Sequence, residues 1–186
     1  MNIFYIHENP AMCAQQHVDK HVVKMILEYA QLLSTAQRIL DGKEVQGVSK
    51  SGRKAKRWEL PDERDVVLYK ASHMNHPSAK WARHSACNYR WLFKLWIELM
   101  REYNYRYGKI HACEKLLDAL RSTPTNIPLG DFFAPTPAMP NELKVVSNNP
   151  QPGRKYDVLK SYHNYYNGDK QRMFSWKNRQ PPDWIS

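Results

Sequence analysis

The sequence predicts an all-α fold, in which two long helices pack together and shorter helices follow toward the C-terminus. Apolar side chains recur at the helical period over residues 10–41 and again over 77–107. Each stretch begins at a residue followed by proline and ends at a glycine, which are common start and stop signals of helices. Because a chain of 186 residues favours one domain, we expect a single helical domain over residues 1–186.

The first half of the chain begins with a short apolar segment. Residues 2–6 are β-prone and predict a short strand or an extended segment against the core. Asn9 can cap a helix and Pro10 suits the first turn, so one long helix is expected from there to Gly42. Residues 43–61 are polar and basic and predict a loop, whereas residues 62–71 fit either a short helix or a strand.

The second half of the chain contains the other long helix. His76-Pro77 predicts its start and Gly108 its end, and a third helix is expected from Lys109 to Arg121. Residues 122–152 include seven prolines, which predict an irregular Pro-rich loop, and their apolar side chains indicate that it lies on the domain. A last pair of helices is expected over about 155–167 and 169–177, with a break at Gly168.

The charge of the chain points to a polyanionic partner. Lys and Arg number 28 against 18 acidic residues, which gives a net charge of +10 and a pI near 9.5. Such an imbalance opposes compaction but attracts polyanions, so the sequence predicts a nucleic-acid partner, with DNA favoured. A merely basic surface is the alternative.

Other compositional signals exclude several classes of protein. The cysteines, Cys13, Cys87 and Cys113, are odd in number and widely spaced, which argues against a disulfide framework or a zinc finger. No apolar run approaches the ~20 residues of a membrane span, and no acylation motif is present. We therefore expect a cytoplasmic location and no membrane partner.

The most informative local feature is a polar stripe in the first predicted helix. His17, His21, Lys24 and Glu28 are spaced by four, three and four residues, which places them on one face of a helix. Imidazoles, an amine and a carboxylate are suited to proton transfer or to holding a phosphate, so these four are the candidate catalytic residues. An ordinary solvated face is the alternative. The spacing of His17 and His21 also suits zinc, but no third ligand is evident, and we predict neither a metal nor another cofactor.

Further polar residues are candidate contacts to nucleic acid. Asn75 and His76 stand at a predicted helix start, where free N–H groups favour a phosphate, and Arg83 and Asn88 follow one to four turns later. Simple capping by Asn75 is the alternative for the helix start, and a solvated loop is the alternative for the basic run from Lys50 to Arg57. The predicted contacts are Lys20, Lys50, Arg53, Lys54, Lys56, Arg57, Asn75, His76, Arg83, Asn88, Arg106 and Lys109.

Four short blocks resemble a family of small phage-encoded proteins. The likeness would cover most of the chain and implies the cytoplasm of an infected host cell. The blocks are His21-Val22-Val23-Lys24-Met25, Asn75-His76-Pro77, Asn88-Tyr89-Arg90-Trp91-Leu92 and Tyr105-Arg106-Tyr107-Gly108-Lys109.

The order of the elements is also distantly similar to that of the phage pyrimidine-dimer DNA glycosylases. Both have a short N-terminal segment, a long helix with a Gln-His pair (Gln16-His17), a Gly-Lys exit (Gly42-Lys43), a basic loop and a second long helix. The resemblance implies a small basic all-α enzyme that excises a damaged base and cleaves the strand through a Schiff base. That family's nucleophile is the α-amine exposed when Met1 is removed, and Asn2 disfavours this removal. His17 matches the family, and Glu28 is the substitute for its catalytic glutamate.

Together these signals predict a DNA-acting enzyme of base-excision or base-modifying type, related to glycosylases. His17 and His21 would contact phosphate or transfer protons, Lys24 would form an imine or clamp a phosphate, and Glu28 would orient it or act as base. One alternative is a non-catalytic nucleic-acid-binding or host-interaction protein, and another is an enzyme acting on free nucleotides. A concave pocket lined by His17, His21 and Lys24 together with Arg83 and Asn88 would favour the enzyme hypothesis, and a position of the three on a convex open face would exclude it.

Overall fold

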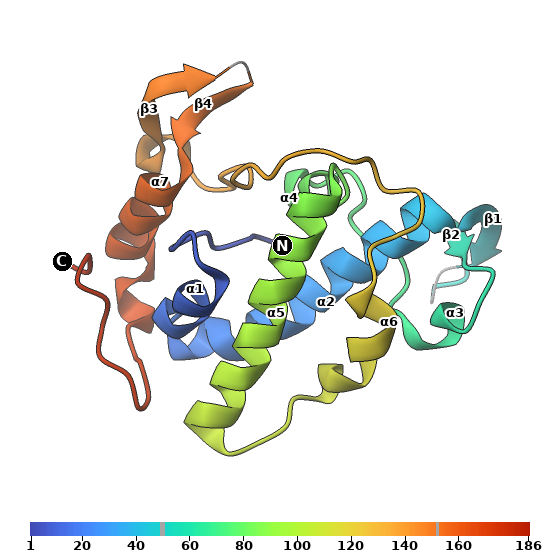
Figure 1. The fold of residues 1–186 in the computed structure, drawn as a ribbon, viewed down its shortest axis with the longest axis horizontal. Coiled ribbons are helices and arrows are strands. Elements are labelled where there is room, and N and C mark those ends of the chain that lie inside the picture. Colours follow the sequence, from blue (N-terminus) through green and yellow to red (C-terminus); the bar gives the residue numbers. More distant parts are fainter. Residues whose placement is uncertain (49–50, 152) are drawn as a thin grey trace.

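The protein is a helical scaffold that carries two antiparallel β-hairpins, as a computed structural model shows (Figure 1). The structure describes residues 1–48, 51–151 and 153–186. The all-α prediction was wrong, because each hairpin forms within or beside a segment that was expected to be a loop or a helix. No helix of the described part of the chain is long and apolar enough to cross a membrane.

Two long helices form the centre of the domain, as the apolar periodicity predicted. Helix α2 (Asp19–Asp41) packs against α5 (Ala86–Tyr107), and the shorter α1 (Pro10–Gln16) also lies against α5. Between α2 and α5, the Trp96 indole nitrogen donates to the carbonyl of Ile26 at 3.0 Å. Residues 3–6 run extended and buried beneath them, so the extended alternative for the N-terminal segment is correct.

The first predicted helix is interrupted at His17 and Val18. Both residues have extended backbone, with ψ of 136° and 152°, so one helix ends at Gln16 and the next begins at Asp19. The break frees carbonyl groups that need donors. The Arg106 guanidinium from α5 donates to the carbonyls of His17 and Gln15 at 3.0 and 2.8 Å, and this long-range contact stabilises the break.

The second predicted helix is also interrupted. Helix α4 (Pro77–Ala82) ends at Arg83, and α5 begins after Ser85, whose hydroxyl accepts from the Asn88 backbone N–H at 3.2 Å. The Asn88 side-chain amide donates to the carbonyl of Trp81 at 3.1 Å and bridges the two helices. Gly108 ends α5 in the left-handed conformation with φ of +62°, as predicted.

The basic segment 43–61 forms the first hairpin. Strand β1 (Lys43–Val48) pairs with β2 (Lys54–Glu59), and the Lys56 amine lies 2.8 Å from a Glu44 carboxylate oxygen across the two strands. Arg38 of α2 donates to the carbonyl of Trp58 at 2.7 Å and attaches the hairpin to the helix. Cross-strand pairing and this attachment supply the stability that an isolated charged loop lacks.

The second hairpin lies beyond the Pro-rich loop. Strand β3 (Val145–Gln151) pairs with β4 (Arg154–Asp157), so the loop prediction over 122–152 was wrong for residues 145–151. The part before β3 lies on the domain as expected, with the Phe133 carbonyl accepting from the Trp81 indole at 2.8 Å.

The remaining elements are short. The segment predicted as helix 109–121 contains a 3-10 helix followed by α6, and the last predicted pair is reduced to α7 and two further turns. Their bounds are α3 Arg64–Val67, η1 Ala112–Leu116, α6 Leu117–Arg121, η2 Asn141–Leu143, α7 Val158–Tyr165, η3 Tyr166–Lys170 and η4 Gln171–Met173.

Candidate functional site

The two histidines of the predicted stripe lie in the core. His17 is fully buried, and its Nδ1 donates to the Cys13 carbonyl at 2.6 Å, since a carbonyl oxygen can only accept. His21 is 4% exposed, and its Nδ1 hydrogen-bonds the Tyr166 hydroxyl at 2.7 Å. The ring of His21 stacks on Phe4 with 4.1 Å between centroids. Each imidazole therefore has a hydrogen-bond partner within the fold. Neither ring is exposed enough for a phosphate from solvent to reach it.

Burial also determines the charge of these histidines. It lowers the pKa of His17 to about 4, and the nearby Arg106 charge lowers it further, against the opposing effects of the Cys13 carbonyl and Glu102. Burial is likewise the largest cause of the low pKa of His21, about 3, and the charge of Lys170 lowers it further. Both rings are neutral at pH 7, so neither supplies a positive charge to a polyanion.

Glu28 lies between two amines near the surface. Its Oε1 is 3.2 Å from the Lys24 amine, and its Oε2 is 3.8 Å from the α-amine of Met1. The Lys24 side chain is 70% exposed, whereas the Met1 and Glu28 side chains are 7% and 16% exposed. The contact between Lys24 and Glu28 could be predicted from their i,i+4 spacing in the sequence. The contact between Met1 and Glu28 could not, because it depends on the path of the N-terminal segment.

His76 belongs to the same neighbourhood. Its Nδ1 accepts from the Ser78 N–H at 3.1 Å and caps α4, so the cap is His76, and Asn75 beside it is exposed. Burial lowers the pKa of His76, the charges of the Met1 amine and of His73 lower it further, and Glu28 opposes them. These mutual effects place the imidazole, the carboxylate and the α-amine within electrostatic reach of one another.

Two predicted phosphate contacts hold the fold together. Asn88 is fully buried, and besides its bond to Trp81 it accepts from the Phe133 N–H at 3.2 Å. Arg106 is 1% exposed and donates to Glu102 at 2.7 Å and to Asp19 at 2.8 Å, in addition to the two carbonyls at the α1–α2 break. The side chains of Asn88 and Arg106 are therefore engaged in hydrogen bonds within the protein and not in a phosphate-binding surface.

The other predicted contacts are dispersed over the molecule. Lys20 is exposed on α2, and Lys109 is exposed just beyond the end of α5. Neither residue belongs to the first hairpin, which carries other basic side chains. On that hairpin, Lys54 is exposed and Arg57 donates to the Val48 carbonyl at 3.3 Å. Arg53 is exposed at the start of β2, and Lys50 lies outside the described residues.

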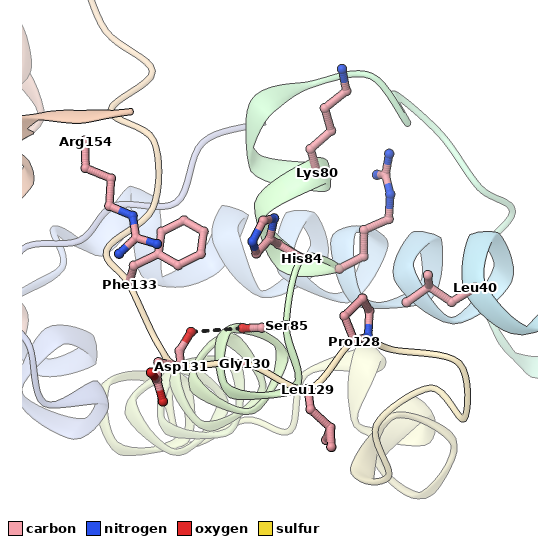
Figure 2. Close-up of a pocket in the computed structure, with 11 residues that line it drawn as sticks. Leu40, Lys80, His84, Ser85, Pro128, Leu129, Gly130, Asp131, Phe133 and Arg154 are labelled. Carbon is pink, nitrogen blue, oxygen red and sulfur yellow. Dashed lines mark hydrogen bonds between the residues drawn. The ribbon is translucent and has the colours of Figure 1, made fainter. Parts of the chain in front are cut away.

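Arg83 lines a cleft of about 600 Å³ that sequence analysis did not anticipate as a whole (Figure 2). Lys80, His84 and Arg154 bring three more basic side chains to it, and Phe133 contributes an aromatic ring. Arg154 comes from the second hairpin and lies over the Phe133 ring at 4.0 Å from its centroid. No local signal relates Arg154 to α4, because the two are joined only by the fold.

The pocket that would favour the enzyme hypothesis is not formed by the stripe. Neither this cleft nor a second one of about 690 Å³, which lies between the Pro-rich loop and β4, is lined by His17, His21, Lys24 or Asn88. Arg83 lines the first. Within the described residues, no three His, Cys, Asp or Glu side chains are grouped as metal ligands. What remains of the stripe as a site is the Glu28 carboxylate with its two amines.

Comparisons with family models, with curated proteins and with solved structures found no match for the chain.

Proposed function

We propose that the protein is a DNA-acting enzyme of the base-excision type, in which an amine held by Glu28 attacks the sugar of a target nucleotide. The observation that supports this proposal is the placement of two amines, from Lys24 and Met1, at 3.2 and 3.8 Å from the two oxygens of one carboxylate. An amine beside a general base is the arrangement that imine-forming enzymes use.

The chemistry requires the substrate, this pair and water. The lone pair of the neutral amine forms a bond to C1′ as the glycosidic bond breaks, and the base leaves as an anion that takes a proton from water. Glu28 takes the proton that the new C1′–N bond sheds and returns it to O4′ as the C1′–O4′ bond opens, which gives a protonated imine. Removal of a C2′ proton would then expel the 3′ phosphate and break the strand.

The charge of the molecule favours a nucleic-acid substrate. The net charge is +10, and exposed cations lie on α2 and on the first hairpin, among them Lys20, Lys24 and Lys54. Such a surface attracts a phosphate backbone without reading its sequence. His76, near Glu28, could contact a phosphate next to the target nucleotide.

Borohydride trapping tests the proposal. The protein is incubated with duplex DNA that contains an abasic site, or a pyrimidine dimer, and the imine is reduced to a stable amine. A covalent adduct is expected, and peptide mapping assigns it to Lys24 or to Met1. Glu28→Gln should reduce trapping at least tenfold, because the base that relieves the amine of its proton is lost.

Lys94→Ala is the matched control, since it removes the same charge from an exposed position on α5 that the proposal does not use. If Lys24→Ala abolishes trapping while Lys94→Ala does not, the lysine is the nucleophile. If both variants trap normally and the adduct maps to Met1, the α-amine of Met1 is the nucleophile. An absence of adduct on both duplexes refutes the enzyme proposal, and salt-dependent binding without adduct would then favour a non-catalytic DNA-binding protein.

A further inference from the structure

The cleft around Arg83 lies at the join of α4, α5 and the Pro-rich loop. Its floor is fixed by the Ser85 segment, where the Ala86 N–H donates to the Pro128 carbonyl at 2.9 Å and the Ser85 hydroxyl donates to the Asp131 carbonyl at 3.3 Å. Leu40, at the end of α2, contributes an apolar wall. With a volume of about 600 Å³, the cleft is in the size range of small-molecule sites.

Arg83 has an unsatisfied donor at this cleft. Its Nη1 is buried and has no hydrogen-bond partner among the described residues. Leaving a charged donor buried without an acceptor costs more than leaving a neutral one, so native proteins seldom do it without a reason. Burial also lowers the pKa of this guanidinium. An anion in the cleft would supply the missing acceptor once the guanidinium turns Nη1 toward it.

The other charged groups of the cleft suit an anion. Arg83 lines the cleft together with Lys80. Lys80 extends outward from α4, and the Asp131 carboxylate lies well apart from it in the view of Figure 2. The guanidinium of Arg154 is held over Phe133 by a cation–π contact, and His84 meets the edge of the same ring at 5.0 Å between centroids. Three permanent cations and an imidazole therefore surround a partly apolar space.

We propose that this cleft binds the phosphate group of a nucleotide, whether free or part of a nucleic-acid strand. A guanidinium presents two parallel N–H donors that match two phosphate oxygens, and Lys80 adds a mobile point charge. The apolar wall of Leu40 and the ring of Phe133 give room for the sugar or base beside the phosphate. The proposal is independent of the imine chemistry at Glu28, because no residue is shared between the two sites.

Arg83→Met is the first test, since methionine keeps the aliphatic stem and removes the buried unpaired nitrogen. Without ligand, its melting temperature should equal or exceed that of the wild type. Addition of 10 mM inorganic phosphate or a deoxynucleoside monophosphate should raise the melting temperature of the wild type and leave that of Arg83→Met unchanged. Arg90→Met, at an exposed position on α5, is the matched control and should respond as the wild type does.

The source of the phosphate is decided by two further measurements. If a free nucleotide is the ligand, a monophosphate should stabilise the wild type more than inorganic phosphate does, and oligonucleotide affinity should not depend on Arg83. If a strand is the ligand, Arg83→Met should weaken oligonucleotide binding and reduce the slope of log affinity against log salt by about 1. Either result supports the cleft. The cleft proposal would be overturned if Arg83→Met shows the same melting-temperature shifts with phosphate and nucleotide, and the same oligonucleotide affinity, as the wild type. This holds even if borohydride trapping at Glu28 succeeds.

Discussion

Mild acid should destabilise this protein through His17 and His21. Both imidazoles are neutral in the folded state because burial lowers their pKa values to about 4 and about 3, from an ordinary 6.5. The unfolded chain binds protons at these two positions as the pH falls below about 6.5, and the folded chain does not. The free energy of unfolding is therefore highest above pH 6.5 and falls as the pH is lowered toward the folded-state pKa values.

The size of the effect depends little on the folded-state pKa. At pH 5 each histidine lies about 1.5 pH units below its unfolded midpoint, which costs about 2 kcal/mol at 1.36 kcal/mol per unit. Two histidines cost about 4 kcal/mol, a large part of the 5–15 kcal/mol typical of folded domains. The pKa values of His76, His111 and His163 are also lowered mainly by burial, so these partly exposed rings add a smaller effect of the same sign.

Urea unfolding followed by tryptophan fluorescence, at pH 7.5, 6.0 and 5.0, measures this loss. The acidic groups with lowered pKa values, among them Asp19, Asp41 and Glu102, titrate below this range and do not contribute to it. His21→Phe keeps a ring on Phe4 and removes one titrating group, so its loss between pH 7.5 and 5.0 should be about 2 kcal/mol smaller than that of the wild type. His84→Gln, which removes an exposed imidazole, is the control. A wild-type stability that is equal at pH 7.5 and pH 5.0 would refute the assignment of these rings as buried and neutral.

Three substitutions test the contacts that determine the fold. Arg106→Met should lower the free energy of unfolding by about 3–5 kcal/mol, because it leaves Asp19 and the carbonyls at the α1–α2 break without their donor. Arg101→Met, 70% exposed on the same helix, should change it by less than about 0.5 kcal/mol, and equal losses in the two variants would contradict this account. Asn88→Ala should cost about 1–3 kcal/mol, since the Trp81 carbonyl and the Phe133 N–H lose their partner. Gly42→Ala should cost about 1–3 kcal/mol because its Cβ would lie 2.5 Å from the Arg38 carbonyl oxygen, and a stability equal to the wild type in urea would show that the chain shifts without strain there.

The extent to which the sequence predicts the fold varies with the range of the interactions. Periodicity and capping signals located the two long helices, the start at Pro10 and the end at Gly108, because those signals act within a few residues. The break at His17 depends on Arg106, which is 89 residues away, and no local pattern contains it. A helix is continued or broken there according to whether its free carbonyls find donors elsewhere in the fold.

The hairpins were missed for a related reason. The segment 43–61 carries so much charge that it predicts a solvated loop, yet the register places Arg57 opposite Val45 and lets Lys56 form an ion pair with Glu44 diagonally across the pair of strands. Strand pairing is a contact between residues about ten positions apart, so it does not appear in composition. Arg38, which is buried at 4% exposure, then joins the hairpin to α2.

Burial separated the residues of the stripe in a way that spacing could not predict. A helix face with His17, His21, Lys24 and Glu28 is polar by composition, but the N-terminal segment covers its first turn and buries the histidines under Phe4. The same segment brings the Met1 amine to Glu28. Lys24 and Glu28, nearer the middle of the helix, are thus not buried by this segment as the histidines are. The Met1 amine that approaches Glu28 was not part of the helical spacing that predicted the stripe.

Two buried nitrogens without partners illustrate how the fold distinguishes a structural group from a ligand-binding one. His17 Nε2 and Arg83 Nη1 both lack a hydrogen-bond partner among the described residues. The imidazole can become neutral, and its pKa falls to about 4, so its nitrogen needs no counter-charge in a core of aromatic rings. A guanidinium keeps its charge at any pH the cell experiences, and Arg83 lines an open cleft with Lys80 and Arg154. The first nitrogen is therefore stable as it is, whereas the second is the one for which we propose an anion as the missing acceptor.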